Sequence, residues 1–346
     1  MKLAVVLFNL GGPDSLEAVQ PYLQNLFSDP AIIQLPAIVR RPLAKFIAAK
    51  RAPLAKKIYE HLGGCSPILA ETEAQARALE QVLRDEGHAA KCFIAMRCWH
   101  PFTKEAVQAV KAFAPDRIVL LPLYPQYSTT TTRSSLEEWR REATRQRLTV
   151  PQHEVCCYPF ENGFVTAIAD LIAEAAKKVK AGVSYRVLFS AHGLPKRVID
   201  KGDPYRWQVE RTVEAVVARL EPNRFEWQIC YQSRVGPLEW IGPATDAEVR
   251  RAGADGKGVI VVPVAFVSEH SETLVELDIE YRKLAAETGV SDYIRTPAVR
   301  THPAFIRALA SLVTTALNAK TPVTCAPERI CPRACVCGHE RALAYV

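Results

Sequence analysis

The segments VVLFNLGGP (residues 5–13) and VLFSAHGLP (residues 187–195) decide the fold. Each is an apolar run that ends in a short turn of polar or small residues with Gly and Pro, and the two lie about half the chain apart. Continuous apolar runs are typical of parallel strands covered on both faces. The repeat therefore predicts two related α/β halves, each with a functional loop at the carboxyl end of its first strand.

Short β-branched runs alternate with helical patterns along the whole chain. Strands are predicted at 3–8, 92–95, 117–122, 154–158, 185–190, 225–230 and 258–266. Helices are predicted at 16–27, 70–87, 103–113, 134–147, 161–180, 205–219, 271–287 and 303–318. This alternation predicts parallel sheets flanked by helices. We expect halves at 1–150 and 151–318, with the last helix a candidate to pack on the first half, and a cysteine-rich extension at 319–346.

Composition and charge exclude several classes of protein. The chain has 346 residues, of which 49% are hydrophobic and 23% charged, so a disordered or low-complexity protein is excluded. The net charge of +7 equals the number of basic residues between 40 and 57, where no acidic residue occurs. These residues are Arg40, Arg41, Lys45, Lys50, Arg51, Lys56 and Lys57. Because the rest is close to neutral, we expect no nucleic acid as a partner.

Targeting and nucleotide-binding motifs are not found. The start MKLAVVLFNLGG lacks the long apolar region and cleavage site of a signal peptide, and no run reaches 18 apolar residues. We therefore expect a cytoplasmic protein with no membrane-spanning helix. The sequence has no GxGxxG after a strand and no Walker A, HExxH or GxSxG motif. Dinucleotide redox chemistry and hydrolysis by a catalytic triad are thus disfavoured.

An acidic helix is predicted after the strand 258–266. Glu272, Glu276 and Glu280 are spaced four residues apart, which places them on one face of a helix. Like charges at this spacing repel, so the line needs solvent or a cation, and carboxylate oxygens suit divalent metals. Glu269 and Asp278 add further negative charge nearby. The pattern predicts either a solvated acidic face or a metal path that leads to the helix start, where His270 and Glu272 lie.

Two further features point to a ligand site. His192 comes at the carboxyl end of the strand 185–190, where a neutral imidazole can take a proton or bind a metal, although a hydrogen-bonded structural histidine is the alternative. The segment CYQSRVGPLEWIGPAT (230–245) is rich in Gly, Pro and aromatic residues. Such a loop is suited to line a flat aromatic ligand, and loop packing alone is the alternative.

Seven motifs together carry a resemblance to a known family. They are LFNLGGPDS, GGCSPI, MRCWHPF, LYPQYS, SAHGLP, YQSRVGPLEWIGPAT and AFVSEHSETLVELDIEY, in that order. The chain closely resembles the ferrochelatases, which insert ferrous iron into a porphyrin to make haem, from about residue 3 to about residue 310. The resemblance implies two Rossmann-like, chelatase-type halves with a porphyrin cleft between them.

The resemblance also implies a reaction and its residues. Fe²⁺, as a substrate, would enter protoporphyrin IX to form haem with release of two protons. His192 and Glu272 would be the catalytic residues, with His192 as proton acceptor, metal ligand or both. The metal-handling set would be His192, Glu272, Glu276 and Glu280. The porphyrin-binding positions would be Asn9, Ser66, Arg97, Tyr127, Tyr231 and Trp240.

Three other functions stay open at this point. A coproporphyrin could replace protoporphyrin as the substrate. A cobalt chelatase of tetrapyrrole synthesis shares the implied fold but is less like the motifs. A non-catalytic haem or iron sensor belongs to a different class, and the pair of His192 and Glu272 argues against it because a sensor does not need to remove protons.

The C-terminal extension holds four of the ten cysteines, Cys325, Cys331, Cys335 and Cys337. Their spacing matches neither ferredoxins nor zinc fingers, but such a density in a reducing compartment favours a metal over disulfides. Some ferrochelatases carry a [2Fe–2S] cluster on three tail cysteines and one internal cysteine. The resemblance implies a cluster on Cys157, Cys331, Cys335 and Cys337, with Cys156 and Cys325 in reserve, because Thr129 stands where the animal enzymes have the internal ligand. A zinc site that uses His339, or thiols without metal, are the alternatives.

Residues 31–58 interleave apolar residues with the seven basic ones. Pro36, Pro42 and Pro53 are predicted to break any long helix there. Basic and apolar residues together suit an anionic membrane surface, and in ferrochelatases this region forms the lip of the active site. We therefore expect a membrane-facing lip at about 31–58 and a protein that is cytoplasmic or peripheral on the cytosolic face. Solvated basic residues over a core, or contacts with porphyrin propionates, are the alternatives, and an oligomer stays open.

Overall fold

The computed structural model describes every residue except 234–235, 237, 320–322, 325–329 and 338–346. The chain divides into two units. The first comprises Met1–Tyr158 and the described parts of Leu309–Cys331 and Val336–Val346, and the second comprises Pro159–Ala308 and Pro332–Cys335. The division therefore follows Tyr158.

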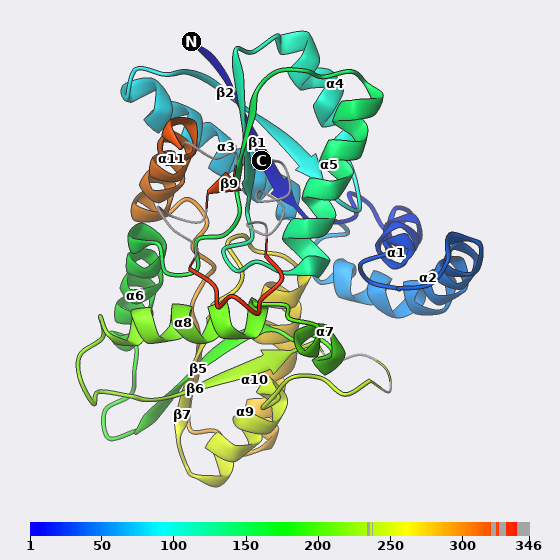
Figure 1. Cartoon of the computed structure of the whole chain (residues 1–346). Coiled ribbons are helices and arrows are strands. Elements are labelled where there is room, and N and C mark those ends of the chain that lie inside the picture. The colour runs from blue at the N-terminus through cyan, green and yellow to red at the C-terminus, as the bar shows by residue number, and fades with distance from the viewer. Residues whose placement is uncertain (234–235, 237, 320–322, 325–329, 338–346) are drawn as a thin grey trace. The chain divides into compact units, whose positions relative to one another are not determined.

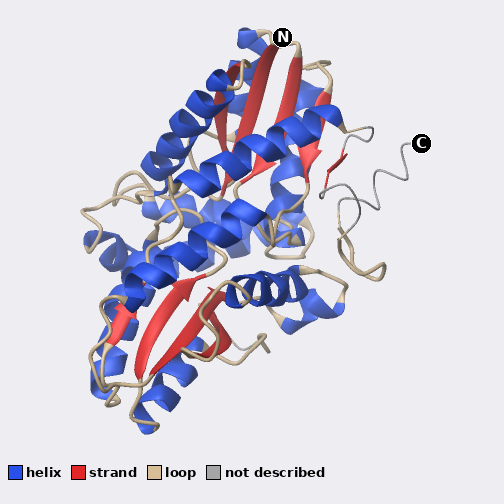
Figure 2. Cartoon of the chain, turned by 90° about the vertical axis from the view of Figure 1, so that its left-hand side faces the viewer, coloured by secondary structure: helices blue, strands red, loops and turns tan. Residues whose placement is uncertain are grey.

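The first unit is built on a parallel sheet with the strand order β2-β1-β3-β4-β9 among the described residues (Figure 2). The strands are β1 (Lys2–Asn9), β2 (Ala89–Met96), β3 (Arg117–Pro122), β4 (Gln152–Val155) and β9 (Val323–Thr324). Every residue of β1 after Lys2 is buried, because helices cover both faces of the sheet. One face packs against α4 and α5 through a core that includes Phe8, Val107 and Trp139.

Helices follow the strands of the first unit in alternation (Figure 1). They are α1 (Val19–Ser28), α2 (Ala37–Glu60), α3 (Ile68–Asp85), α4 (Thr103–Phe113) and α5 (Ser134–Arg145), with a short π-helix, η1 (Thr129–Arg133), before α5. The helix α11 (Pro303–Asn318) begins in the second unit and belongs to the first from Leu309 onward.

The second unit repeats this plan with the parallel strand order β6-β5-β7-β8. The strands are β5 (Tyr185–His192), β6 (Glu226–Gln232), β7 (Gly258–Pro263) and β8 (Tyr293–Arg295). The helices are α6 (Asn162–Ala176), α7 (Lys196–Asp200), α8 (Tyr205–Val217), α9 (Thr245–Ala254), the π-helix η2 (Glu272–Glu280) and α10 (Tyr281–Glu287). The core on one face of the sheet joins Leu188, Val261 and Leu277.

The two units share one topology. In each, the first strand is central, the second lies on one side, and the third and fourth lie on the other. Phe8 pairs with Pro122 at the end of β3, and Ser190 pairs with Pro263 at the end of β7. Phe8 and Ser190 therefore occupy equivalent positions in the two sheets. They are also matched when the sequences of residues 5–13 and 187–195 are aligned. The predicted fold class, two α/β halves with parallel sheets flanked by helices, is confirmed.

The prediction that prolines break any long helix in residues 31–58 is wrong. The helix α2 runs from Ala37 to Glu60 with Pro42 and Pro53 inside it. Both prolines are exposed, so the carbonyls that lose their helical partners can bond to water. The opposite face carries small residues, among them Ala48 and Ala52, which pack against α1 in a core with Tyr22. The helix therefore gains tertiary contacts that offset the cost of its prolines.

Candidate active site

The candidate site of the second unit lies at the carboxyl ends of β5, β6 and β7. His192 is the last residue of β5 and pairs in register with Gln232, the last residue of β6. The chain leaves β7 at Pro263 and enters η2 at Glu272. Because carboxyl ends of parallel strands meet at one edge of a sheet, this topology brings together side chains from three distant segments.

His192 and Glu272 form a direct contact. Nδ1 of His192 lies 2.9 Å from Oε2 of Glu272, and the two side chains are 37% and 30% exposed. Burial disfavours the charged form of each group, but their mutual attraction and hydrogen bond outweigh it. The pKa of His192 is therefore raised, and the pKa of Glu272 is lowered to about 2, with His270 adding to the effect on Glu272.

The state of this pair has a chemical consequence. An ionised carboxylate can only accept a hydrogen bond, so Nδ1 of His192 carries the proton in the contact with Glu272. Nε2 of the neutral ring then holds the lone pair. The pair is thus arranged to take a proton at Nε2, with Glu272 to stabilise the imidazolium that forms.

A second histidine lies on the other side of Glu272. Nε2 of His270 is 3.9 Å from the same carboxylate oxygen, Oε2. Burial lowers the pKa of His270 despite the nearby carboxylates of Glu272 and Glu269. The backbone N–H of Thr273 donates to Nδ1 of His270 at 3.3 Å, so the ring proton belongs on Nε2, facing Glu272. Glu272 therefore lies between two histidines, one whose pKa is raised and one whose pKa is lowered.

The acidic helix is a π-helix over Glu272–Glu280, a conformation that the sequence did not predict. Such helices are rare and are frequent at functional sites. The carboxylate of Glu276 is surrounded by donors: Nε2 of Gln232 at 3.1 Å, the N–H of Ser233 at 2.9 Å, the hydroxyl of Tyr281 at 2.9 Å and the hydroxyl of Ser233. Burial and Glu276 raise the pKa of Tyr281, so its hydroxyl keeps the proton that it donates.

The other acidic residues of the segment differ in their surroundings. Glu280, at the end of η2, is exposed. Glu269 is buried and accepts from Nη1 of Arg295 at 3.0 Å, while Asp278 lies 3.3 Å from the same guanidinium. Arg295, together with Arg282 at 2.6 Å from Asp278, therefore compensates the two carboxylates that the sequence suggested as extra negative charge. The acidic character of the site rests on Glu272, Glu276 and Glu280.

Tyr231 and Trp240 flank the residue that follows His192. A Cβ atom on Gly193 would lie 3.3 Å from the ring of Trp240, 3.8 Å from Tyr231 and 2.8 Å from the carbonyl oxygen of Gln232. Tyr231 is buried, and its hydroxyl has no hydrogen-bond partner among the described residues. These two aromatic residues therefore lie within reach of the turn that carries His192.

In the first unit, Arg97 lies just beyond the end of β2 and is held by an internal carboxylate. Its Nη2 is 3.0 Å from Oδ2 of Asp29, and its Nε donates to Oγ of Ser134 at 2.7 Å. The hydroxyl of Ser134 also contacts Oδ2 of Asp29 at 2.5 Å. Arg97 is thus oriented by a closed triangle of three side chains, of which Asp29 and Ser134 were not predicted.

The other predicted residues of the first unit occupy the same edge of its sheet. Asn9, the last residue of β1, donates to Oγ1 of Thr72 at 3.1 Å. The hydroxyl of Ser66 lies so close to Gly12 that a Cβ atom there would overlap it. Tyr127, ahead of η1, accepts from Nε of Arg133 at 3.1 Å. With Arg97, four predicted residues therefore lie at strand ends or in loops. Asn9 ends β1, and Ser66, Arg97 and Tyr127 follow α2, β2 and β3.

Sequence reasoning missed three residues that hold the acidic helix, namely Gln232, Ser233 and Tyr281. Gln232 and Ser233 belong to the same YQSR motif as Tyr231, and Tyr281 ends the motif LDIEY, so the signal was present. What the sequence could not supply was the π-helical turn. That turn places Tyr281 and Glu276, five residues apart, next to one another.

The described residues hold no group of three or more His, Cys, Asp or Glu side chains that could bind a metal ion. The described residues include Cys157, Cys331, Cys335 and Cys337, of which Cys335 is half-buried and the others are buried. No three of these four cysteines therefore form such a group. Cys325 and His339 lie outside the described residues.

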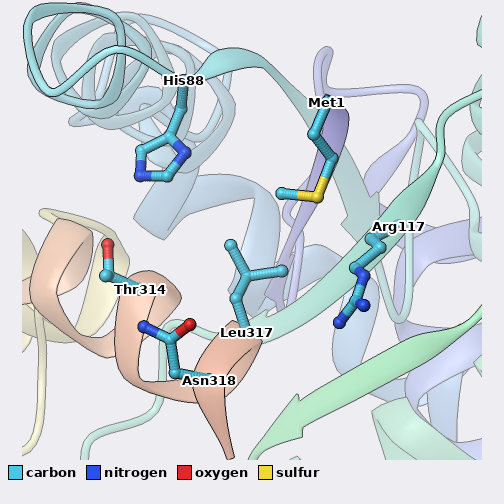
Figure 3. Close-up of a pocket in the computed structure, with 6 residues that line it drawn as sticks. All are labelled: Met1, His88, Arg117, Thr314, Leu317 and Asn318. Atoms are coloured by element: carbon cyan, nitrogen blue, oxygen red, sulfur yellow. The ribbon is translucent and has the colours of Figure 1, made fainter.

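The first unit contains a cavity of about 270 Å³ (Figure 3). Its lining comes from the amino ends of β1, β2 and β3 and from the end of α11: Met1, His88, Arg117, Thr314, Leu317 and Asn318. None of these side chains was predicted to be functional. The cavity is at the edge of the sheet opposite to the one where ligands of α/β folds bind.

Comparison with known proteins places the chain in a family. The model of the family "Ferrochelatase" matches residues 2–317. The ferrochelatase of Caulobacter vibrioides is 57% identical over 314 residues, covering 90% of this chain and 89% of the relative. The ferrochelatase of Phenylobacterium zucineum is 55% identical over 342 residues, covering 97% of this chain and 98% of the relative.

Solved structures show the same fold at low sequence identity. The structure of SirB from Bacillus subtilis with Fe³⁺ matches with a TM-score of 0.52 and 15% identity, covering 92% of this chain and 96% of that one. At this identity the likeness concerns the fold alone. It agrees with the two parallel sheets described above.

Proposed function

The chain belongs to the ferrochelatase family, and we propose that His192 and Glu272 form the centre at which it inserts ferrous iron into a porphyrin for haem biosynthesis. The observation that carries this proposal is the 2.9 Å contact between Nδ1 of His192 and Oε2 of Glu272. It joins a proton acceptor to a carboxylate at the sheet edge where α/β folds bind ligands.

The reaction requires two N–H protons to leave the porphyrin while a cation enters. Nε2 of His192 accepts a pyrrole proton, and the Glu272 carboxylate stabilises the imidazolium that results. His192 can lose this proton to solvent, because its side chain is 37% exposed, and the restored neutral ring then accepts the second pyrrole proton. Distortion of the porphyrin in the expected cleft would expose the nitrogen lone pairs to the entering metal.

We further propose that the acidic helix handles Fe²⁺ as a substrate. Carboxylates on one helix face can replace the water of a divalent cation stepwise. Glu280 is exposed and is the outermost of the three, whereas Glu272 contacts His192. Glu276 is already bonded to several donors, so its part is to hold the helix and the local charge rather than to surround the metal. The predicted metal-handling role is thus best supported for Glu272 and Glu280.

The porphyrin-binding role of Asn9, Ser66, Arg97, Tyr127, Tyr231 and Trp240 is likewise proposed. Support comes from their positions at the carboxyl-end loops of each unit and, for Tyr231 and Trp240, from contact with the turn after His192. Arg97 keeps a side chain that is 17% exposed while its charge is compensated by Asp29. Arg97 is therefore suited to donate hydrogen bonds to an anionic or polar edge of the ligand. It is less suited to neutralise a charge of the ligand, because Asp29 already compensates its own charge.

Anaerobic turnover with Fe²⁺ tests the proposal. The purified protein is given protoporphyrin IX or coproporphyrin III, and loss of the free-base visible bands is followed over many equivalents. We expect repeated turnover, and the faster porphyrin identifies the substrate. His192→Ala should lower kcat by at least about a hundredfold, as removal of a general base does. His88→Ala is the matched control, because His88 precedes the amino end of β2 and none of the predicted site residues lies there. Near-normal turnover by His192→Ala would overturn the proposed role.

An anionic membrane surface is proposed as a partner of α2. Support comes from its exposed apolar residues, Ile38 at 84%, Phe46 at 65% and Leu54 at 66%, which share the helix with the basic residues. No described helix is both long and apolar enough to cross a bilayer. In flotation with anionic vesicles we expect the wild type and Trp227→Ser to rise with the lipid, and a triple Ser variant of the three α2 residues to stay behind. Equal flotation of all three proteins would contradict the proposal.

The [2Fe–2S] cluster stays a proposal from the sequence. It is supported by the density of thiols in residues 325–337, whereas the described cysteines do not gather as a ligand set. No step of the reaction is assigned to it. Protein isolated anaerobically should contain two iron and two sulfide ions per chain by chemical analysis, a visible absorption band and, after reduction, an EPR signal. Cys331→Ser with Cys337→Ser should lose them, and iron-free protein after such isolation would rule the cluster out.

A further inference from the structure

We infer that Tyr281 is a positioning residue for metal insertion: it holds Glu276 from the end of the π-helix and thereby keeps Glu272 in place against His192. The inference rests on the proposed function of that pair. Tyr281 is the first residue after η2, and its hydroxyl lies 2.9 Å from Oε1 of Glu276.

Two hydrogen bonds join Tyr281 to Glu276. The backbone N–H of Tyr281 donates to the carbonyl oxygen of Glu276, and its phenol donates to the carboxylate of the same residue. The backbone bond spans five residues, which is the pattern of a π-helix. In an α-helix, residues five apart are separated by about 140° around the axis, so the phenol would point away from Glu276. The side-chain bond is therefore available only while the π-turn is formed, and it stabilises that turn.

Gln232 ties the same helix to the sheet from the other side. Its Nε2 lies 3.1 Å from the carbonyl oxygen of Glu272 and 3.1 Å from Oε2 of Glu276. Oγ of Ser190 donates to Oε1 of Gln232 at 2.8 Å, which fixes the orientation of the amide. Gln232 thus holds the start and the middle of η2, whereas Tyr281 holds its middle and end.

The inferred role follows from this arrangement. The backbone of Glu272 is placed by Gln232, and Gln232 shares the Glu276 carboxylate with Tyr281. Without the phenol, Oε1 of Glu276 keeps only the N–H of Ser233 as a donor, so the carboxylate is held less firmly in its place beside Gln232. The end of η2 next to Tyr281 would then no longer help to keep Glu272 in contact with His192. Tyr281 touches neither reacting residue and acts through Glu276.

Tyr281→Phe tests the inference because it removes the hydroxyl and keeps the ring. We expect kcat to fall about tenfold, which corresponds to about 1.4 kcal/mol of transition-state stabilisation, with KM for porphyrin changed less than about twofold. Tyr185→Phe is the matched control, because Tyr185 donates to the carboxylate of Asp292 at 2.7 Å in the same unit but far along the chain from η2. It should keep wild-type kcat, and urea unfolding should show that both variants are folded.

A double-mutant cycle separates positioning from a general structural effect. In a Glu276→Gln background, Tyr281→Phe should lower kcat by less than about twofold, because the bond that it removes has already lost its charged acceptor. Wild-type kcat in Tyr281→Phe, or a full tenfold loss on top of Glu276→Gln, would overturn the inference. The proposed function would still hold after either result if His192→Ala lowers turnover as expected. The experiments therefore distinguish a failure of the role of Tyr281 from a failure of the role of His192.

Discussion

Nδ1 of His192 lies 2.9 Å from Oε2 of Glu272, although 80 residues separate the two in the sequence. The contact joins the last residue of β5 to the first residue of η2, two elements that meet because β5 and β7 are neighbours in one parallel sheet. At this distance Glu272 raises the pKa of His192, and His192 lowers the pKa of Glu272. The protonation state of each group therefore depends on the other.

The first prediction concerns the titration of His192. In the wild type, Glu272 raises the pKa of His192 against the effect of burial. Glu272→Gln removes the negative charge and leaves the burial, so the pKa of His192 should fall, and the neutral ring should dominate at lower pH than in the wild type. The titration is followed by NMR of histidine-labelled protein, with the signal of His192 assigned through His192→Ala.

His302 supplies the control for this titration. It lies in the second unit, 3.5 Å from Asp170, and does not contact the active pair. At a fixed pH, its signal should have the same chemical shift in the wild type and in Glu272→Gln. A His192 signal that keeps or raises its midpoint in Glu272→Gln would show that the carboxylate does not set the charge of the ring.

The second prediction compares two carboxylates of the acidic helix. Glu276→Gln places an amide where the Glu276 oxygens accept from Gln232, Ser233 and Tyr281, so at least one donor is left without an acceptor. We expect about 1–3 kcal/mol loss of unfolding free energy and at least about tenfold lower kcat. Glu280→Gln, at an exposed position, should keep wild-type stability and show its effect only in KM for Fe²⁺.

Urea unfolding and anaerobic kinetics at varied Fe²⁺ measure both variants. The comparison is decisive because the substitutions are chemically identical and four residues apart on one helix. If Glu280→Gln destabilised the protein as much as Glu276→Gln, the difference in their hydrogen bonding would not control stability.

Much of the fold could be predicted because its strands are continuous apolar runs. The strand Arg117–Pro122 and the helix Thr103–Phe113 were predicted with the bounds that the structure has. The helix α2 was missed because proline is a strong local signal, whereas the packing of Ala48 and Ala52 on α1 depends on a segment outside the helix. Local patterns report local preferences, and tertiary contacts can override them.

The site was predictable to the extent that its residues follow strands. His192 and Glu272 could be named from motifs at strand ends, and the structure brings them together. The triangle of Arg97, Asp29 and Ser134 could not, because its members lie on three segments with no shared pattern. The π-helix could not either, since i, i+4 spacing of acidic residues is equally compatible with an α-helix.

The third prediction tests the triangle around Arg97. The side chain of Asp29 is 3% exposed, and it accepts from Arg97, Ser134 and the N–H of Ala31. Asp29→Ala leaves a largely buried guanidinium without its carboxylate, which should cost about 3–5 kcal/mol of unfolding free energy. Glu73→Ala removes an exposed partner of Arg77 at 3.8 Å and should cost less than about 1 kcal/mol.

Equilibrium unfolding in urea gives both numbers. A cost for Asp29→Ala as small as that of Glu73→Ala would mean that Arg97 finds another partner when Asp29 is absent. The proposed orientation of Arg97 toward the ligand would then not depend on the triangle.

The fourth prediction concerns Gly193, the residue after His192. Its N–H donates to the carbonyl oxygen of Gln232 at 2.9 Å, and a Cβ atom would lie 2.8 Å from that oxygen and 3.3 Å from Trp240. Gly193→Ala must therefore push the end of β6 or Trp240 away. Because Gln232 also places Glu272, we expect kcat to fall at least about tenfold together with weaker porphyrin binding.

Gly182→Asn is the control for Gly193→Ala. Gly182 has a φ of +77°, a conformation that Asn tolerates, and a Cβ atom there would meet no atom within 4 Å. That variant should keep wild-type kcat and porphyrin affinity, as measured by turnover and by fluorescence titration with protoporphyrin IX. If Gly193→Ala matched this control in both measurements, the carbonyl of Gln232 would have to move without disturbing the hydrogen bond of its side chain to Glu272. The close approach at Gly193 would then not be what positions the catalytic pair.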